Sequence, residues 1–294
     1  MRRLGWFAQF REWLLHQPVF TSTILPAIPR PMRWLLRKLY FFPLDLMERI
    51  SGERDAMVPS RAENFTGSAV GFEQSGEELV EKLVRSAGLD DHSHVLDVGC
   101  GVGRLAVALT RHLSASGGYE GLDIVPSGIK WCNANVTRRY PNFRFTLADV
   151  FNHEYNPRGR FKASEYRFPY EDGSFDLAVL VSVFTHMLPD DMNRYIQEIR
   201  RVLKPGGRCY VTYFLMNEER TRLMHSGESI LRFKHRVGPH WLVSLKAPAL
   251  SVGYDETYIR DTYARSFAET RFHLGGWSRS DLGDQDVVVA RTDH

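Results

Sequence analysis

Short apolar runs alternate with segments of helical spacing through the middle of the 294-residue chain. The apolar runs that predict strands cover residues 94–98, 119–124, 143–149, 175–182 and 208–214. The helical patterns that lie before or between them cover residues 79–87, 104–113, 127–138 and 191–203. The run at 175–182 is nearly all apolar, as is typical of a strand that is buried on both faces. Strands that alternate with helices predict a parallel sheet with helices on both faces.

Three glycines follow the first predicted strand, at Gly99, Gly101 and Gly103, where a helix is about to begin. Glycines at a strand-to-helix turn let the backbone approach a ligand, and the helix start offers free N–H groups. The spacing here is G-x-G-x-G, whereas the dinucleotide fingerprint is G-x-G-x-x-G. Asp97 stands just before the turn, and a carboxylate repels a pyrophosphate but attracts a positively charged amine. The pattern therefore disfavours an NAD-dependent oxidoreductase, which stays open as an alternative.

Five sequence motifs occur in order along the central region. They are VLDVGCGVG at 95–103, GLDI at 121–124, LADV at 147–150, FPYEDGSFD at 168–176 and RVLKPGGRCYVTYF at 201–214. With these motifs the chain resembles the class I S-adenosylmethionine-dependent methyltransferases of the small-molecule type. The resemblance implies an α/β fold, a Rossmann-like seven-stranded sheet with helices on both faces and its last strand inserted antiparallel. Strands predicted near 270–274 and at 285–291 fit that ending.

The resemblance also implies S-adenosyl-L-methionine as the cofactor and assigns roles to residues at the strand ends. Asp97 and the glycine turn would hold the amine and the carboxylate of the methionine part. Asp123 would accept hydrogen bonds from the two ribose hydroxyls, and Ile124 would contact the adenine. The turn residues that share this implied role are Gly99, Cys100, Gly101 and Gly103. Without the resemblance, Asp123 could instead be a helix cap.

Two further strand ends complete the implied cofactor site. Asp149 would accept a hydrogen bond from the adenine amino group, and the Val150 N–H would face a ring nitrogen. Ser182 and Val183, which follow the fourth strand, would lie near the methionine part and the transferring methyl group. Without the resemblance, Asp149 could be an ordinary turn residue.

Methyl transfer is an in-line displacement at an activated carbon, so the protein mainly has to align the reactants and exclude water. A neutral hydroxyl acceptor also benefits from a general base. His186 is the candidate base, because it lies just beyond the fourth strand and an imidazole titrates near neutral pH. The alternative is a histidine packed under the cofactor with no proton role. No metal site is predicted, because Asp190 and Asp191 are better explained as caps of the helix that follows.

Two segments set this chain apart from a minimal family member and are expected to bind the acceptor. They are insertions at about 150–168 and about 215–253. The candidate substrate residues in and beside them are Tyr166, Arg232, Lys234, Arg236, Tyr254 and Trp277. In an extended segment the three cations would share one face and could bind a phosphate, carboxylate or acidic sugar, although a solvated charge run is the simpler alternative. Trp277 could stack on an acceptor ring or cap the core.

Residues 1–74 are predicted to form an N-terminal helical arm and lid, followed by a methyltransferase domain at 75–294. Prolines separate two predicted helices of the arm, near 4–16 and 32–41. Basic residues are interleaved there with tryptophan and phenylalanine, a pattern found in helices that lie on anionic membrane surfaces. Membrane or lipid contact would involve residues 1–43, and the simpler alternative is an arm whose aromatics pack on the catalytic domain. Residues 65–67 could close over the cofactor as part of the lid.

The overall composition narrows the function classes further. Hydrophobic residues make up 43% and charged residues 25%, as in an ordinary soluble globular protein. The formal net charge of +3 is too small for a dedicated nucleic-acid binder. The three cysteines are odd in number and far apart, which favours a reducing compartment and therefore a cytoplasmic location, with membrane association left open.

The expected function is O-methylation of a small polar acceptor, such as a saccharide, glycoconjugate or secondary-metabolite hydroxyl. A lipid or other hydrophobic acceptor at a membrane surface is the first alternative, and a cofactor-binding protein without catalysis is another. The sequence predicts neither the identity of the acceptor nor the oligomeric state.

Overall fold

The computed structural model describes residues 30–52, 55–64, 71–153, 155–229, 231–278 and 284–293. It divides into two compact units, residues 1–65 and residues 66–294, and each is described by itself. The helix predicted near 4–16 and the lid residues 65–67 lie outside the described residues.

The described part of the first unit contains one long helix, α3 (Arg30–Ser51). The predicted helix at 32–41 forms part of it, but the helix is longer than predicted because it continues through Pro43. The segment at 55–64 packs on α3 through polar contacts. The Asp45 carboxylate, for example, accepts a hydrogen bond of 2.8 Å from the Arg61 backbone N–H. Arg61 in turn donates from Nε to Glu48 at 2.8 Å. Among the described residues, no helix has both the length and the apolar character needed to cross a bilayer.

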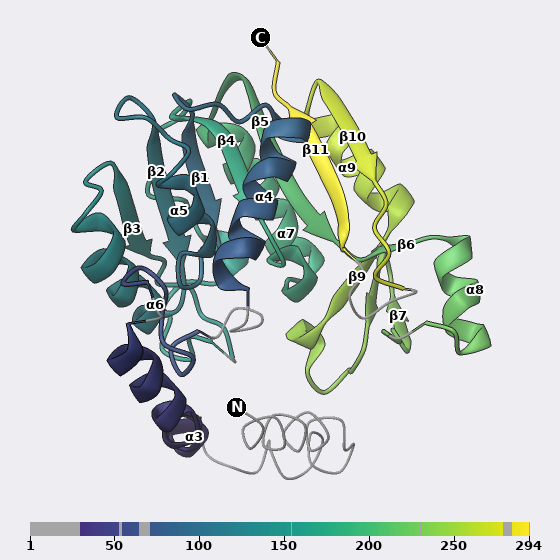
Figure 1. Ribbon diagram of the computed structural model, residues 1–294. Helices are drawn as coiled ribbons and strands as arrows, with labels where there is room; N and C mark the ends of the chain where they lie inside the picture. Colours follow the sequence, from purple (N-terminus) through teal and green to yellow (C-terminus); the bar gives the residue numbers. More distant parts are fainter. Residues whose placement is uncertain are drawn as a thin grey trace. The chain divides into compact units, whose positions relative to one another are not determined.

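The second unit is built on a seven-stranded sheet in the order β10-β11-β5-β4-β1-β2-β3 (Figure 1). The strands are β1 (His94–Val98), β2 (Gly118–Asp123), β3 (Phe143–Leu147), β4 (Phe175–Leu180), β5 (Leu203–Tyr213), β10 (Glu269–His273) and β11 (Asp286–Arg291). Strands β1 to β5 pair in parallel, and β11 lies antiparallel to both β5 and β10. This order and the antiparallel β11 confirm the predicted fold class.

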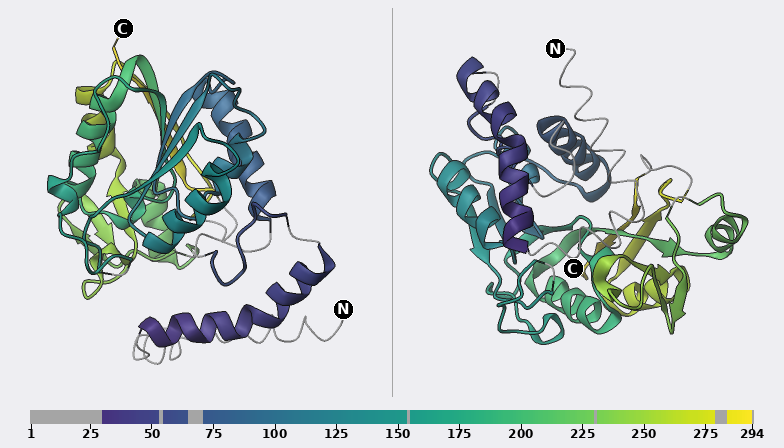
Figure 2. Two further views of the ribbon diagram at one scale, coloured as in Figure 1. Left: turned by 90° about the vertical axis from the view of Figure 1, so that its left-hand side faces the viewer. Right: turned by 90° about the horizontal axis from the view of Figure 1, so that it is seen from below.

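Helices cover both faces of this sheet, as the alternating pattern predicts. On one face lie α4 (Phe72–Ala87), α5 (Arg104–Leu109) and α6 (Pro126–Cys132), and on the other lie α7 (Pro189–Val202) and α9 (Glu256–Ser266) (Figures 1 and 2). Neighbouring residues of a strand point to opposite faces. Val95 and Leu96 of β1 are both fully buried, so each helix layer packs on an apolar side chain of the central strand. Two covered faces explain why the central strands are continuously apolar.

A second, four-stranded sheet was not predicted from the sequence. It consists of β6 (Leu215–Met216), β9 (Val252–Asp255), β8 (His240–Leu242) and β7 (His235–Val237), and α8 (Glu218–Ser226) follows β6. These elements correspond to the insertion expected at 215–253. Tyr254, a candidate substrate residue, lies in β9, and α9 begins directly after this strand at Glu256. Strands of two to four residues carry too few positions to show an alternating pattern.

Candidate cofactor and acceptor site

The glycine turn joins the carboxyl end of β1 to the start of α5. Gly99 and Gly103 have φ angles of 81° and 76°, a left-handed backbone that favours glycine. A Cβ atom at Gly99 would lie 2.5 Å from Cγ2 of Val183, so the turn needs a residue without a side chain at this position. The structure therefore brings together the glycine turn and Val183, two parts of the predicted site that are 84 positions apart in the sequence.

Asp97 is buried beneath this turn. The Tyr119 hydroxyl donates a hydrogen bond of 2.6 Å to its carboxylate. Burial raises the pKa of Asp97 to about 7, with a smaller upward contribution from the Asp123 charge, while the bond from Tyr119 lowers it. A carboxyl group in this state gains its negative charge near neutral pH, where it can attract a cationic amine.

Asp123 at the end of β2 connects the glycine turn to the next helix. One carboxylate oxygen accepts from the Gly101 N–H at 2.7 Å, and the other accepts from the Val125 N–H at 2.8 Å. Burial raises the pKa of this carboxyl group, and the backbone hydrogen bonds from Gly101 and Val125 oppose that rise. The cap position of α6 is Val125, so Asp123 stabilises the turn before the helix rather than acting as its cap. The partly buried Ile124 packs against the adjoining core cluster.

Asp149 follows β3 and pairs with Arg160 of the first insertion. The Arg160 side chain donates to the carboxylate, and its backbone N–H lies 3.2 Å from the other oxygen. The side-chain hydrogen bond from Arg160 lowers the pKa of Asp149. Val150 is buried and bridges to Phe161, so the insertion folds back over the end of β3. The adenine-binding roles of Asp149 and Val150 stay predictions.

The segment after β4 carries the two residues expected beside the transferring methyl group. Ser182 has a φ of 59°, which is unusual for a residue other than glycine. Its N–H donates to Thr212 Oγ1 at 2.8 Å, and its hydroxyl donates to Gln285 Oε1 at 3.1 Å. These bonds to β5 and to the residue before β11 hold the strained backbone in place. Such strain is often found at functional sites.

His186 lies at the end of a short 3₁₀ helix, Phe184–His186, directly after this segment. Its Nδ1 is 3.1 Å from the carbonyl oxygen of Ala249. A carbonyl oxygen can only accept, so Nδ1 must carry the hydrogen. In the neutral imidazole, Nε2 is then the nitrogen with a free lone pair and can accept a proton.

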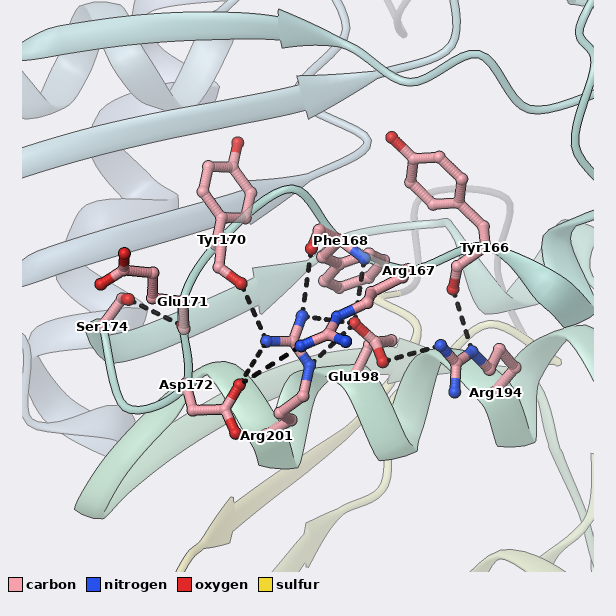
Figure 3. A network of polar contacts seen from close by, with 10 residues as sticks. All are labelled: Tyr166, Arg167, Phe168, Tyr170, Glu171, Asp172, Ser174, Arg194, Glu198 and Arg201. Carbon is pink, nitrogen blue, oxygen red and sulfur yellow. Dashed lines mark hydrogen bonds and ion pairs between the residues drawn. The ribbon is translucent and has the colours of Figure 1, made fainter.

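A buried polar network holds the loop that contains Tyr166 and the FPYEDGSFD motif (Figure 3). Glu198 of α7 accepts from the Phe168 N–H at 2.9 Å and from Arg201 Nη2 at 2.6 Å. Arg201 also donates to the carbonyl oxygens of Phe168 and Tyr170, and Arg194 Nε donates to that of Tyr166 at 2.9 Å. These residues were not predicted from the sequence. The signal that could have revealed them is an acidic and a basic residue, Glu198 and Arg201, three positions apart on the inner side of a helix.

The aromatic acceptor candidates are largely enclosed. Tyr254 is fully buried, and its hydroxyl donates to the Met187 carbonyl at 2.6 Å. Trp277 is 4% exposed and donates from Nε1 to Asp286 at 2.6 Å. Its ring packs on Phe214 with the ring centres 5.0 Å apart. The structure thus supports the alternative that Trp277 caps the core, and Tyr166 is also buried.

The three candidate cations do not converge on one ligand position. Arg236 of β7 donates to Asp255 at 2.6 Å and lies over the Trp241 ring, whereas Arg232 donates to the Gly227 carbonyl at 3.2 Å. Lys234 is exposed. Arg236, Trp241 and Asp255 line a pocket of about 700 Å³ between α8, the small sheet and the start of α9. Within the described ranges, no group of three or more potential metal ligands occurs.

Comparison with known proteins identifies a methyltransferase domain in this chain. A family model described as a methyltransferase domain matches residues 96–211. Methyltransferase GfsG of Streptomyces halstedii is 30% identical over 140 residues, which cover 47% of this chain and 44% of that protein. A phthiotriol/phenolphthiotriol dimycocerosates methyltransferase of Mycobacterium tuberculosis H37Rv is 35% identical over 113 residues, or 38% of this chain and 34% of that protein. The chain thus spans less than half the length of these curated relatives.

Among solved structures, the fold is similar to that of the PH0226 protein from Pyrococcus horikoshii OT3. The TM-score is 0.52 at 18% identity, and the match covers 80% of this chain and 96% of that one. This likeness concerns the fold alone. The matched domain and the curated relatives support a class I S-adenosylmethionine-dependent methyltransferase family for the region that they cover.

Proposed function

We propose that this protein transfers a methyl group from S-adenosyl-L-methionine to a hydroxyl group of a small polar acceptor. The observation that carries this proposal is the orientation of His186, whose Nδ1 is 3.1 Å from the Ala249 carbonyl. This bond leaves Nε2 as the basic nitrogen, just after the carboxyl end of β4. Open α/β sheets bind their ligands at that edge.

The buried acids and the glycine turn are the groups that would hold the cofactor. Asp97 would attract the amine of the methionine part, and the N–H groups of the glycine turn would approach its carboxylate. Asp123 would face the ribose, and Asp149 with Val150 would face the adenine. When bound, the cofactor supplies a methyl group that is activated by a positively charged sulfur.

The protein's own contribution to the reaction would be alignment and proton removal. His186 would take the proton of the acceptor hydroxyl at Nε2, which makes the oxygen a better nucleophile. Ser182 and Val183 would line the space beside the reacting groups, and the network around Glu198 keeps the neighbouring loop rigid. The charged side chains of Arg236 and Asp255 in the pocket beside α8 support a polar acceptor, such as a saccharide, glycoconjugate or secondary-metabolite hydroxyl.

A transfer assay with methyl-labelled S-adenosylmethionine and a panel of saccharides, glycosides and phenols tests this function. We expect His186→Gln to lower turnover by about 100-fold or more while the affinity for S-adenosylhomocysteine is retained. His92→Gln is the matched control, because His92 has a side chain that is 69% exposed and lies next to the opposite end of β1. Equal turnover in the wild type and in His186→Gln would show that His186 is not the general base.

A second candidate function is methylation of a lipid or other hydrophobic acceptor at a membrane surface. It is favoured by the apolar side chains on α3, where Leu39 and Phe42 are each 62% exposed and Ile50 is 78% exposed. The name of the mycobacterial relative, a phthiotriol/phenolphthiotriol dimycocerosates methyltransferase, is compatible with such an acceptor. Sedimentation with anionic vesicles should be lost in Leu39→Glu/Phe42→Glu. Unchanged sedimentation, or none in the wild type, would argue against this second function.

A further inference from the structure

A pocket rich in arginine lies at the edge of the large sheet opposite the glycine turn. Its volume is about 340 Å³, and it lies between the end of α4 and the strands β5, β11 and β10. The charged side chains that line it are four arginines and one glutamate: Arg85, Arg208, Arg271, Arg291 and Glu269. The cofactor-site residues described above do not line it. The pocket is therefore a second candidate site, separate from the predicted methyl-transfer chemistry.

The register of the strands explains why these side chains converge. Arg208 of β5 is paired directly with Arg291 of β11, and Arg291 is paired with Glu269 of β10. Directly paired residues project from the same face with their Cβ atoms about 5 Å apart. Arg271 follows Glu269 by two positions and shares its face. Two like charges in direct opposition destabilise a sheet unless a negative group lies nearby.

The Arg208 guanidinium lies in a space that the backbone provides. Gly88 ends α4 with a φ of 68°, and a Cβ atom at this position would lie 2.2 Å from Arg208 Nη1. The same nitrogen is 3.5 Å from the carbonyl oxygen of Ala87, at the carboxyl end of the helix. A cation is favoured at a helix C-terminus. Gly88 thus allows the guanidinium to reach the pocket wall, where its remaining N–H groups can meet a ligand.

The carboxylates near the pocket leave two of its cations without an ion pair. Glu269 pairs with Arg291 at 2.6 Å, and Arg85 contacts Glu81 at 3.6 Å on the exposed helix surface. Among the described residues, neither Arg208 nor Arg271 has a carboxylate within 4.0 Å. The pocket therefore carries an excess of positive charge.

We infer that this pocket binds a phosphate group, either as free phosphate or as a phosphate monoester. A guanidinium presents a planar set of N–H donors that matches the oxygens of phosphate, and paired arginines at one site favour a dianion. Bound phosphate would neutralise the positive charge that Arg208 and Arg271 bring to the pocket. This inference does not depend on the proposed methyl transfer, because the pocket lies at the other edge of the sheet.

Isothermal titration calorimetry of the full chain with inorganic phosphate tests the inference, with sodium chloride at equal ionic strength as the reference. We expect a dissociation constant on the order of 1 mM for a site with a few charge-assisted hydrogen bonds. Arg271→Glu should weaken binding by about tenfold or more, and because Arg271 is exposed on an edge strand the variant should fold. A second variant, Arg208→Gln, should have a similar effect, with circular dichroism as the check on folding.

Arg144→Gln is the matched control, since Arg144 lies on β3 of the same sheet and its side chain is 72% exposed. Glycerol 3-phosphate is titrated in parallel, and tighter binding than inorganic phosphate would identify a monoester as the ligand. Equal binding by the wild type and Arg271→Glu would contradict the inference, as would the absence of binding at 50 times the expected dissociation constant, or about 50 mM.

Discussion

The buried Asp97 gives the protein a dependence of stability on pH that one substitution should remove. Burial raises its pKa from the ordinary value of 3.8 to about 7. Between these two pH values the folded protein keeps a proton that the unfolded chain has lost. The contribution of Asp97 to folding stability is therefore fully present below about pH 4, falls as the pH rises from 4 to 7, and is lost above that. At about 1.4 kcal/mol for each pH unit, the full loss above pH 7 is about 4 kcal/mol.

Asp97→Asn keeps the shape of the side chain and an oxygen that can accept from the Tyr119 hydroxyl, but it has no charge to bury. From pH 5 to pH 8 the wild type loses about 3 kcal/mol through Asp97, and the variant should not. Urea unfolding at pH 5, 6, 7 and 8 measures the difference. Relative to the wild type, the variant should gain about 3 kcal/mol of stability from pH 5 to pH 8.

Groups that titrate elsewhere affect both proteins equally, so only the difference between the two curves is interpreted. Asp284→Asn is the control, because its side chain is 71% exposed and its loss should leave the curves parallel. If the wild type and Asp97→Asn keep a constant difference from pH 5 to pH 8, Asp97 does not titrate there and the reasoning is refuted.

Three further predictions concern the groups around the site. Glu198→Gln should destabilise the fold by about 3 kcal/mol, measured by urea unfolding, because among the described residues it leaves Arg201 with only the exposed Asp172 as an ionic partner. A loss below about 1 kcal/mol would contradict this. Ser182→Gly should stabilise the protein by about 0.5–1 kcal/mol, since glycine adopts a φ of 59° without strain; a lower melting temperature would argue against strain. Arg160→Ala should raise the pKa of Asp149 toward 3.8, because the hydrogen bond from Arg160 is lost. The chemical shift of the carboxyl carbon, followed by NMR against pH, measures this pKa. An unchanged pKa would show that Arg160 does not lower it.

The central sheet could be predicted from the sequence because its strands are buried on both faces and therefore apolar throughout. Val95 and Leu96, for example, are adjacent and both fully buried. The motif order also predicted that the ends of β1, β2 and β4 meet, and the contact between Gly99 and Val183 shows that two of them do. Local pattern and strand order were sufficient for this part of the molecule.

The acceptor side could not be predicted in the same way, because its contacts join distant positions. Trp277 is enclosed because its indole N–H donates a hydrogen bond to Asp286 and the Arg220 guanidinium lies 4.7 Å from its ring centre. Arg220 comes from α8, more than 50 positions earlier in the chain. Nothing near Trp277 in the sequence reveals that partner. Likewise, only the folded insertion shows that Arg160 reaches Asp149.

The central claim is that the glycine turn, with Asp97 and Asp123, forms an S-adenosylmethionine site. Titration calorimetry with S-adenosylhomocysteine and, separately, with NADH tests it most directly in the wild type and in Asp123→Ala. We expect binding of S-adenosylhomocysteine alone, weakened by about tenfold or more in Asp123→Ala through loss of hydrogen bonds to a charged group. Binding of NADH alone, or equal affinity of both proteins for S-adenosylhomocysteine, would contradict it.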